Sequence, residues 1–250
     1  MQTNDRARKG RREFLRATGT AAVGLAIGVL AFGAGTAIGA EAGLKIGIVG
    51  SGRIGGTLGA IWLKAGHEVM FSSLDLEHDK ALAARLGGKA RAGTTREAAA
   101  FGEVLMIAVP YAALPQVGRE LGELIRGKVV IDTCNPVASR DGDIATWARE
   151  KGAGLASAEL LPGARLVRAF NAIGYARQAE ASQRQGERIG MPMAGDDAGA
   201  IALASRLVRE IGYEPVVIGP LAMGRYLIPG TPLAGEHTPE SIRKIAATLK

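Results

Sequence analysis

The chain has 250 residues, of which 47% are hydrophobic, and this is enough for a buried core in one large domain or two small ones. The formal net charge is +7, but no Lys/Arg-rich block interleaved with aromatic residues follows the basic N-terminal segment, so nucleic acid is not an expected partner. The single cysteine, Cys134, excludes an intramolecular disulfide. The three histidines lie far apart, without the spacing of metal ligands, so no metal site is expected.

The first 42 residues have the layout of an export signal. A basic segment containing Arg11-Arg12-Glu13-Phe14-Leu15-Arg16 precedes an uncharged apolar run from Ala17 to Gly39. The arginine pair and its neighbours resemble the motif of the twin-arginine pathway, which exports folded proteins. We therefore expect a signal peptide over residues 1–42, recognition by the twin-arginine export machinery, and a periplasmic or otherwise exported protein. Cleavage after Gly39 or after Ala42 fits equally, and an uncleaved membrane anchor is the alternative.

A glycine-rich turn follows the leader, between a predicted strand and a predicted helix. The apolar run Ile46–Val49 indicates a buried strand, and Thr57–Ala65 has the apolar spacing of a helix. Between them the chain reads Gly50-Ser51-Gly52-Arg53-Ile54-Gly55, the G-x-G-x-x-G spacing of a dinucleotide-binding turn. The first glycine permits the turn, the second lets the main chain approach a pyrophosphate, and the third lets the helix pack on the strand. We predict that these six residues bind the cofactor phosphates at the positive end of the helix dipole.

The next strand bears on the choice between NAD and NADP. Glu68–Phe71 is predicted to end at Ser72 and Ser73, where an NAD site commonly has an acidic residue for the ribose 2′-hydroxyl. The two serines, with Arg53 as a cation, favour the 2′-phosphate of NADP. Asp75 keeps NAD open, because a shift of the strand end would bring its carboxylate near the ribose, and the serines are also typical of a plain turn.

Short apolar runs and helical patterns alternate along the rest of the chain. Strands are predicted near Ala90 and over Val104–Val109, Val129–Asp132, Leu166–Phe170, Ile189–Ala194 and Pro215–Ile218. Helices are predicted over Asp79–Leu86, Thr95–Phe101, the residues ending at Ile125, the residues through Trp147, Ala198–Ile211 and Ser241–Leu249. Residues 176–187 are polar and aperiodic, which indicates a loop or lid, and residues 221–250 are expected to form a loose tail.

Ligands of a doubly wound sheet lie outside the carboxyl ends of its strands. Val109, Pro110 and Tyr111 are therefore predicted to flank the nicotinamide, although Tyr111 is equally typical of a rim aromatic that covers a helix. Asn135 and Asn171 each follow a predicted strand, and an amide offers both a donor and an acceptor to a carboxamide or a flavin-like ring. These two asparagines are the candidate catalytic residues, with orienting roles.

Two other polar groups have plainer interpretations. Cys134 has no histidine nearby in sequence to activate it, so we interpret it as a packing residue. Asp196 or Asp197 is expected to cap the helix that follows.

Five motifs occur in a recognisable order: Lys45–Gly56, Ala108-Val109-Pro110, Asp132-Thr133-x-Asn135-Pro136, Arg168-Ala169-Phe170-Asn171 and Ala194-Gly195-Asp196-Asp197. In this combination the chain resembles the coenzyme F420-dependent NADP oxidoreductases, whose fold is also similar to the reductase domain of the six-transmembrane metalloreductases. The resemblance implies hydride transfer between NADP(H) and a deazaflavin or flavin-like ring, and makes a homodimer plausible. Leu74 departs from the family, which commonly has arginine after the serine that ends the second strand.

The sequence as a whole predicts an α/β protein, a Rossmann-type doubly wound, mainly parallel sheet with a short C-terminal extension. The expected parts are a signal over residues 1–42, an NAD(P)-binding domain over 43–220 and a tail over 221–250. The expected function is an NAD(P)H-dependent oxidoreductase with a small-molecule electron acceptor, F420 or a flavin. Two alternatives stay open: an NAD(P)-binding sensor or carrier without turnover, and a β-hydroxyacid-type dehydrogenase. The latter needs a lysine in its second half, and the chain has none between Gly152 and Arg243.

Overall fold

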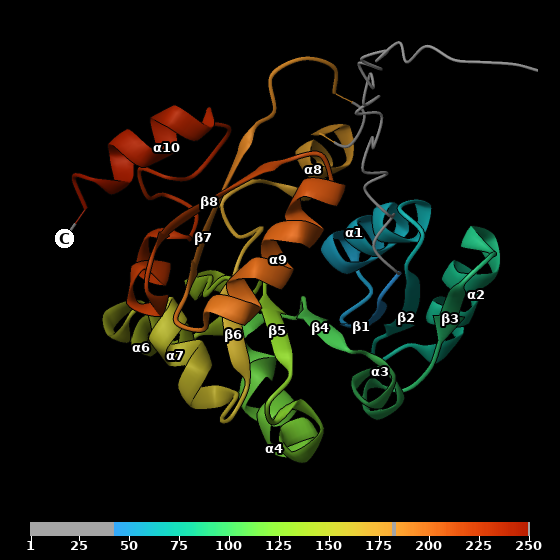
Figure 1. Cartoon of the computed structure of the whole chain (residues 1–250). Coiled ribbons are helices and arrows are strands. Elements are labelled where there is room, and N and C mark those ends of the chain that lie inside the picture. Colours follow the sequence, from blue (N-terminus) through green and yellow to red (C-terminus); the bar gives the residue numbers. More distant parts are fainter. Residues whose placement is uncertain (1–42, 182–183, 250) are drawn as a thin grey trace, which may run out of the picture. The chain divides into compact units, whose positions relative to one another are not determined.

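A single sheet organises residues 43–181 and 184–249, the part of the chain that the computed structural model describes (Figure 1). The predicted export signal lies outside these residues. The strands are β1 (Lys45–Val49), β2 (Glu68–Ser72), β3 (Ala90–Ala92), β4 (Val104–Ile107), β5 (Val129–Asp132), β6 (Arg165–Arg168), β7 (Gly190–Gly195) and β8 (Glu214–Gly219). Their order across the sheet is β3-β2-β1-β4-β5-β6-β7-β8. The first six positions have the strand order of a dinucleotide-binding Rossmann sheet, which confirms the predicted fold class.

The directions of the strands decide which loops meet. Strands β1 to β6 run parallel to one another, whereas β7 pairs antiparallel with β6, and β8 runs parallel to β7. The loops after β1, β2, β4, β5 and β6 therefore lie at one edge of the sheet. Asp196 and Asp197, which follow β7, lie at the opposite edge, away from the other predicted strand ends. There Asp197 caps the next helix by accepting a hydrogen bond from the backbone N–H of Ala200.

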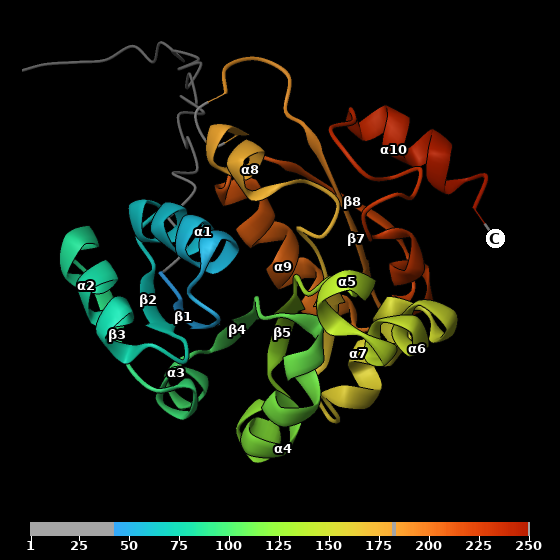
Figure 2. The ribbon, with the colours of Figure 1, turned by 180° about the vertical axis from the view of Figure 1, so that it is seen from behind.

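Helices cover both faces of the sheet. They are α1 (Arg53–Lys64), α2 (Leu76–Leu86), α3 (Thr95–Phe101), α4 (Leu114–Ile125), α5 (Ala138–Asp141), α6 (Asp143–Lys151), α7 (Ala153–Leu160), α8 (Tyr175–Ala181), α9 (Ala198–Glu210) and α10 (Pro239–Ala246), with 3₁₀ turns η1 (Tyr111–Ala113) and η2 (Leu221–Tyr226). Figure 1 shows α9 on one face, and Figure 2 shows the opposite side with α4 and α7.

Alternation along the strands explains these two layers. Val104 and Met106 of β4 pack in a core with α1 and α9, whereas Leu105 and Ile107 pack in a second core with α4 and α7. Successive side chains of a strand point to opposite faces, so a strand buried on both sides needs an unbroken apolar run. The four residues of β4 are all fully buried, as that run requires.

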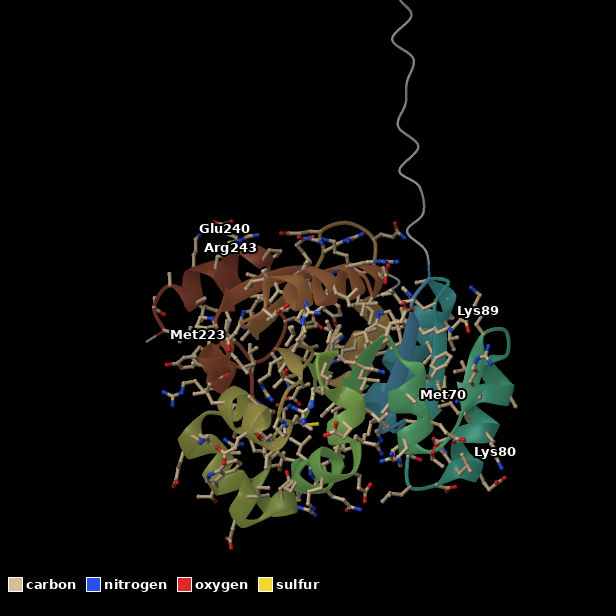
Figure 3. All side chains as sticks on the ribbon, turned by 60° about the horizontal axis from the view of Figure 1, so that its bottom comes forward. Met70, Lys80, Lys89, Met223, Glu240 and Arg243 are labelled. Atoms are coloured by element: carbon tan, nitrogen blue, oxygen red, sulfur yellow. The ribbon has the colours of Figure 1, made fainter. Side chains whose placement is uncertain are left out.

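The structure corrects two local expectations. Residues 175–181 form α8 rather than a loop or lid. Only Gln178 and Ala181 of this helix are buried, so its sequence lacks the apolar periodicity by which a helix is predicted. The expected loose tail is instead packed. Leu227, Leu233 and Ile242 are fully buried in a third core against β7 and β8. In Figure 3, Glu240 and Arg243 extend to the outside of α10, on either side of the buried Ile242 in sequence.

None of the helices in the described residues is both long enough and apolar enough to cross a bilayer.

Candidate functional site

The glycine turn joins β1 to α1 at the carboxyl edge of the sheet. Gly50 has a φ of +101°, and a Cβ atom on it would lie 2.4 Å from the carbonyl oxygen of Ala108. A Cβ on Gly55 would lie 2.1 Å from the carbonyl oxygen of Gly50. Both positions therefore need glycine for the fold itself. Gly52 differs, because its φ is −63° and a Cβ there would have no neighbour within 4 Å. The bare main chain at Gly52 fits the close approach of a pyrophosphate.

The first turn of α1 suits an anion. Gly52 caps the helix without a side-chain hydrogen bond, and the first turn contains no acidic residue. Uncapped N–H groups at a helix N-terminus attract phosphate through hydrogen bonds and the helix dipole. Arg53 is exposed in this turn, and its guanidinium lies 5.3 Å from the centre of the Tyr175 ring. The turn thus combines backbone donors with one cation.

The two serines at the end of β2 have structural roles. Ser72 is buried, its hydroxyl donates to the carbonyl of Ile48 at 2.7 Å, and its own carbonyl accepts from the N–H groups of Gly50 and Ser51. The prediction that the Ser72 hydroxyl binds the cofactor is therefore wrong, because that hydroxyl bonds to strand β1 and the Ser72 carbonyl holds the glycine turn.

Asp79 holds the other two hydroxyls of this region. It is fully buried on α2, and its carboxylate accepts hydrogen bonds from Ser51 and from Ser73, the latter at 2.9 Å. The hydroxyls of Ser51 and Ser73 are thus directed at a carboxylate of the protein rather than at the cofactor position. Asp79 was not among the predicted site residues, because its only signal in the sequence is an acid in the first turn of a helix.

A cavity of about 350 Å³, the strand-end cavity, lies between the glycine turn and the ends of β4 and β5. Its lining residues include Arg53, Ile54, Ala108, Val109, Pro110, Thr133, Asn135, Arg140 and Pro229. Five of the residues predicted from separate motifs therefore meet around one space: Arg53, Ile54, Val109, Pro110 and Asn135.

Tyr111 does not join them. It is fully buried, and its hydroxyl lies 3.2 Å from the carbonyl oxygen of Ala153 and 3.1 Å from Oγ of Ser157, both on α7. Burial raises the pKa of this phenol well above its ordinary value. The prediction of a cofactor-binding Tyr111 is thus wrong, because the ring packs in the core beneath η1 instead of turning to the sheet edge.

A buried ion pair supports the loop after β5. Arg168 of β6 and Asp132 of β5 are both fully buried and bonded to each other. Arg168 also donates to the carbonyl of Cys134 at 3.1 Å and to Oδ1 of Asn135 at 3.4 Å. A guanidinium with several acceptors around it fixes their geometry. Arg168 was not among the predicted site residues, but its guanidinium orients the amide of Asn135, a candidate catalytic residue.

The same loop is tied down at two more points. Cys134 is buried, its Sγ donates to the carbonyl of Ile107 at 3.4 Å, and burial raises the pKa of its thiol, so the structure supports the packing interpretation. Arg140 donates to the carbonyl of Asn135 at 2.8 Å and pairs with Asp141. Burial by itself would raise the pKa of Asp141, but hydrogen bonds from Arg140 and from backbone N–H groups lower it overall.

A second cavity of about 330 Å³, the asparagine cavity, lies beside the first, with which it shares Ile54, Asn135 and Pro229. Asn171, the other candidate catalytic residue, lines it, and the side-chain amide of Asn135 donates to the backbone carbonyl of Asn171 at 2.9 Å. The structure therefore brings the two asparagines together, with Asn135 facing both cavities.

The chemistry of both cavities is almost free of titratable groups. Apart from Arg53, Arg140 and the phenol of Tyr175, their lining residues carry no ionisable side chain. Across residues 43–181 and 184–249, no group of three or more His, Cys, Asp or Glu side chains is placed to hold a metal ion. The site can therefore position ligands and exclude water, but it lacks the usual proton donors.

The fold and the glycine turn together define a Rossmann-type nucleotide-binding protein. Residues 45–136 match the sequence profile of the family described as NADP oxidoreductase, coenzyme F420-dependent, which confirms the resemblance inferred from the motifs. No protein of curated function matches the chain in sequence.

Solved structures support the same fold. A hypothetical protein from Sinorhizobium meliloti has a TM-score of 0.65 and 22% identity, over 78% of this chain and 95% of that one. A proposed F420-dependent NADP reductase from Arthrobacter has a TM-score of 0.62 and 21% identity, over 73% and 88%. The 3-hydroxyisobutyrate dehydrogenase of Mycobacterium tuberculosis has a TM-score of 0.54 and 16% identity, over 73% and 57%. At these identities the likeness shows the fold alone. The family match over residues 45–136 supports an NADP-dependent oxidoreductase in general terms.

Proposed function

We propose that this protein transfers a hydride between NADP(H) and a deazaflavin or flavin-like acceptor. The observation that carries the proposal is the pair of adjoining cavities at the carboxyl edge of the sheet, which share Ile54, Asn135 and Pro229 beside the glycine turn. Hydride transfer depends on holding two reacting carbon or nitrogen atoms in a near-attack pose. Two neighbouring cavities with a common wall are suited to that task.

The nicotinamide half of the cofactor would lie in the strand-end cavity. The phosphates would bind at the N-terminus of α1, where Gly52 leaves the main chain open, and the nicotinamide would lie against Val109 and Pro110. NADP(H), when bound, supplies or accepts the hydride. We favour NADP over NAD on the family match and on Arg53, which is exposed at the turn.

The scarcity of proton donors in the cavity walls favours some acceptors over others. Reduction of a carbonyl or an imine needs a general acid near the reacting group. Among the residues that the structure describes, no Lys, His, Asp or Glu side chain lines either cavity, and the phenol of Tyr175 is 40% exposed. A conjugated ring can delocalise the added electron pair and take its proton from water, so a ring acceptor suits these cavities better than a β-hydroxyacid or its ketone.

The test is hydride transfer in solution. The purified protein is mixed with NADPH or NADH, and absorbance is followed with F420, FMN, FAD and a ferric chelate in turn. We expect NADPH oxidation with a ring acceptor. Binding of the nucleotides without reduction of any acceptor would refute the enzyme and support a nucleotide-binding protein without turnover.

Asn135→Ala tests the assignment of the shared wall. Asn135 contacts both cavities, so we expect turnover to fall by about tenfold or more, while NADPH affinity stays within about threefold. The matched control is Gln116→Ala, which removes an exposed amide on α4 that bonds only to Glu120 among the interactions described. A large loss of NADPH affinity in Asn135→Ala would place this residue on the cofactor instead of between the two rings.

We also propose that the protein is exported by the twin-arginine pathway, on the basis of the sequence of residues 1–42. Replacement of both Arg11 and Arg12 by Lys should retain the protein in the cytoplasm of a cell that otherwise exports it. Fractionation with an antibody to the folded domain measures this. An unchanged distribution would refute the export signal.

A homodimer, which the family resemblance suggests, is checked by light scattering on the same preparation.

A further inference from the structure

A third cavity, of about 510 Å³, lies between α1 and α2, two helices that Figure 2 shows next to each other. This space, the helix cavity, also reaches the glycine turn, and its lining residues are Ser51, Gly52, Arg53, Gly56, Thr57, Ala60, His78, Leu82, Arg85 and Leu86. Arg53 lines both the helix cavity and the strand-end cavity, so the two adjoin at the turn. A dinucleotide with its pyrophosphate at this turn and its nicotinamide in the strand-end cavity has its adenosine half near α2.

The end of β2, where the ribose of that half lies in this fold, offers no cation to a 2′-phosphate. The Ser72 hydroxyl donates to the carbonyl of Ile48 at 2.7 Å, and the Ser73 hydroxyl donates to Asp79 at 2.9 Å. Leu74, the next residue, is fully exposed and carries no charge. If the protein discriminates between NADP and NAD, the charge that does so must come from another element.

The helix cavity contains such charge. Three of its lining residues can be cationic: Arg53, His78 and Arg85. His78 and Arg85 are seven residues apart on α2, which is two helical turns, so they lie on the same face of that helix. Both side chains are exposed, and neither makes a hydrogen bond or an ion pair with another residue that the structure describes. Their N–H groups are therefore available to a ligand.

The acidic side chains of this region bond to other groups. Asp75 accepts a hydrogen bond from the backbone N–H of His78 at 2.9 Å, and Glu77 pairs with Lys80 at 2.8 Å. The carboxylate of Asp79 accepts from two serine hydroxyls. Within the described part of the chain, no Asp or Glu lines the helix cavity. The charge that its walls present is thus positive, as binding of a phosphate group requires.

We propose that the helix cavity is the site that selects NADP over NAD, and that Arg85 and His78 bind the 2′-phosphate in place of a cation directly after β2. A guanidinium offers a fork of N–H donors with a permanent charge, and an imidazole donates an N–H in either protonation state. NAD has a hydroxyl instead of the phosphate and gains neither charge-assisted contact. The proposal rests on the proposed function, because it places the pyrophosphate at Gly52.

The test measures the affinities of the purified protein for NADPH and NADH, by titration of nucleotide fluorescence without any acceptor. We expect NADPH to bind at least about tenfold more tightly, because hydrogen bonds to a charged group are strong. In Arg85→Ala the ratio of the two affinities should fall to about threefold or less, while NADH affinity stays within about twofold. His78→Ala should shift the ratio in the same direction by a smaller factor. Equal affinities in the wild type, or an unchanged ratio in Arg85→Ala, would overturn the proposal.

Lys80→Ala is the matched control. It also removes a cation from α2, but Lys80 pairs with Glu77 and does not line the helix cavity, so the ratio should keep its wild-type value. A fall as large as that in Arg85→Ala would show a general effect of positive charge on α2 and would overturn the proposal. NADH affinity and a thermal scan confirm that each variant is folded.

Fragments of the cofactor show whether the site recognises the nucleotide or any phosphate. Adenosine 2′,5′-bisphosphate and 5′-AMP differ only in the 2′-phosphate. We expect the bisphosphate to displace NADPH at about a tenfold lower concentration than 5′-AMP, and this difference should disappear in Arg85→Ala. Equal potency of the two fragments in the wild type would overturn the proposal. Inorganic phosphate as potent as the bisphosphate would also overturn it, because the site would then bind a free anion.

The outcomes distinguish this inference from the proposed function. The affinity ratio is an equilibrium property and does not require turnover. If Arg85→Ala lowers the ratio as expected but NADPH reduces no acceptor, the inference stands and the proposed function fails. If NADPH reduces an acceptor and the ratio is the same in Arg85→Ala as in the wild type, the proposed function stands and the role of Arg85 is refuted.

Discussion

Gly52→Ala should separate cofactor binding from stability. The methyl group would have no atom of the protein within 4 Å, and the φ of −63° and ψ of −155° describe an extended backbone that needs no positive φ. The loss of freedom in the unfolded chain stabilises the variant by about 0.4–1 kcal/mol. Alanine is less favourable than glycine as a helix N-cap by a similar amount. The two effects offset each other, so the midpoint of thermal unfolding should shift by no more than about 4 °C.

The effect on NADPH affinity should be much larger. The methyl group would stand where the pyrophosphate approaches the main chain, and each hydrogen bond to a charged group contributes about 1.5–3 kcal/mol. Loss of one such bond weakens NADPH binding by about 10- to 150-fold. Titration of NADPH fluorescence measures the affinity, and a thermal scan of the same sample measures stability.

Two other glycines provide the controls for Gly52→Ala. Gly122→Ala on α4 also adds a methyl group to open space, and it should leave NADPH affinity unchanged. Gly55→Ala would place its Cβ 2.1 Å from the carbonyl oxygen of Gly50, so it should destabilise the fold itself. If Gly52→Ala binds NADPH with wild-type affinity, the pyrophosphate does not approach the main chain at Gly52. If Gly52→Ala unfolds at a temperature as low as Gly55→Ala does, Gly52 is needed for the fold, and the reasoning is also refuted.

Three further substitutions test the supports of the site. Asp132→Asn leaves Arg168 buried without its carboxylate and should lower the free energy of unfolding in urea by about 3–5 kcal/mol, whereas a loss below about 1 kcal/mol would contradict a tightly coupled pair. Asp141→Asn should lower the free energy of unfolding by about 1–3 kcal/mol at pH values above the ordinary aspartate pKa of 3.8, because the ionised carboxylate bonds to Arg140. This loss should disappear as the pH falls through the lowered pKa of Asp141 in the folded protein. An equal loss of stability at pH 7 and pH 3 would contradict this. Tyr111→Phe should lower the free energy of unfolding by about 1 kcal/mol and leave NADPH affinity unchanged in a titration, because the Tyr111 hydroxyl bonds only within the core. Weaker NADPH binding by Tyr111→Phe would support the prediction that Tyr111 binds the cofactor.

The sequence was sufficient for features that depend on neighbours in the chain. The glycine turn needs only a strand before it, a helix after it and three glycines at fixed spacing, and all of these are local. Val109, Pro110 and Asn135 each follow a buried apolar run, and parallel strands bring such positions to one edge. Their meeting around one cavity therefore followed from strand pattern and fold class without any knowledge of side-chain packing.

Side-chain direction at the same edge could not be predicted in this way. Ser72 and Tyr111 also lie at strand ends, but one bonds to the carbonyl of Ile48 and the other to α7. Which way a terminal side chain turns depends on what packs beside it. Asp79 shows the same dependence, because its carboxylate reaches Ser51 only after α2 has docked against the turn.

The strands, the phosphate-binding turn and the list of polar strand ends were thus determined by the sequence itself, through periodicity and backbone sterics. Tertiary structure alone decided that Arg168 would pair with Asp132, 36 residues earlier, and orient Asn135. It also decided that β7 would run antiparallel to β6, so that Asp197 caps a helix at the opposite edge from the site. A buried apolar run has the same pattern whether its strand runs parallel or antiparallel to its neighbour. A contact between residues far apart in the chain does not change the local periodicity. Neither the direction of β7 nor the pairing of Arg168 with Asp132 could therefore be predicted from the sequence.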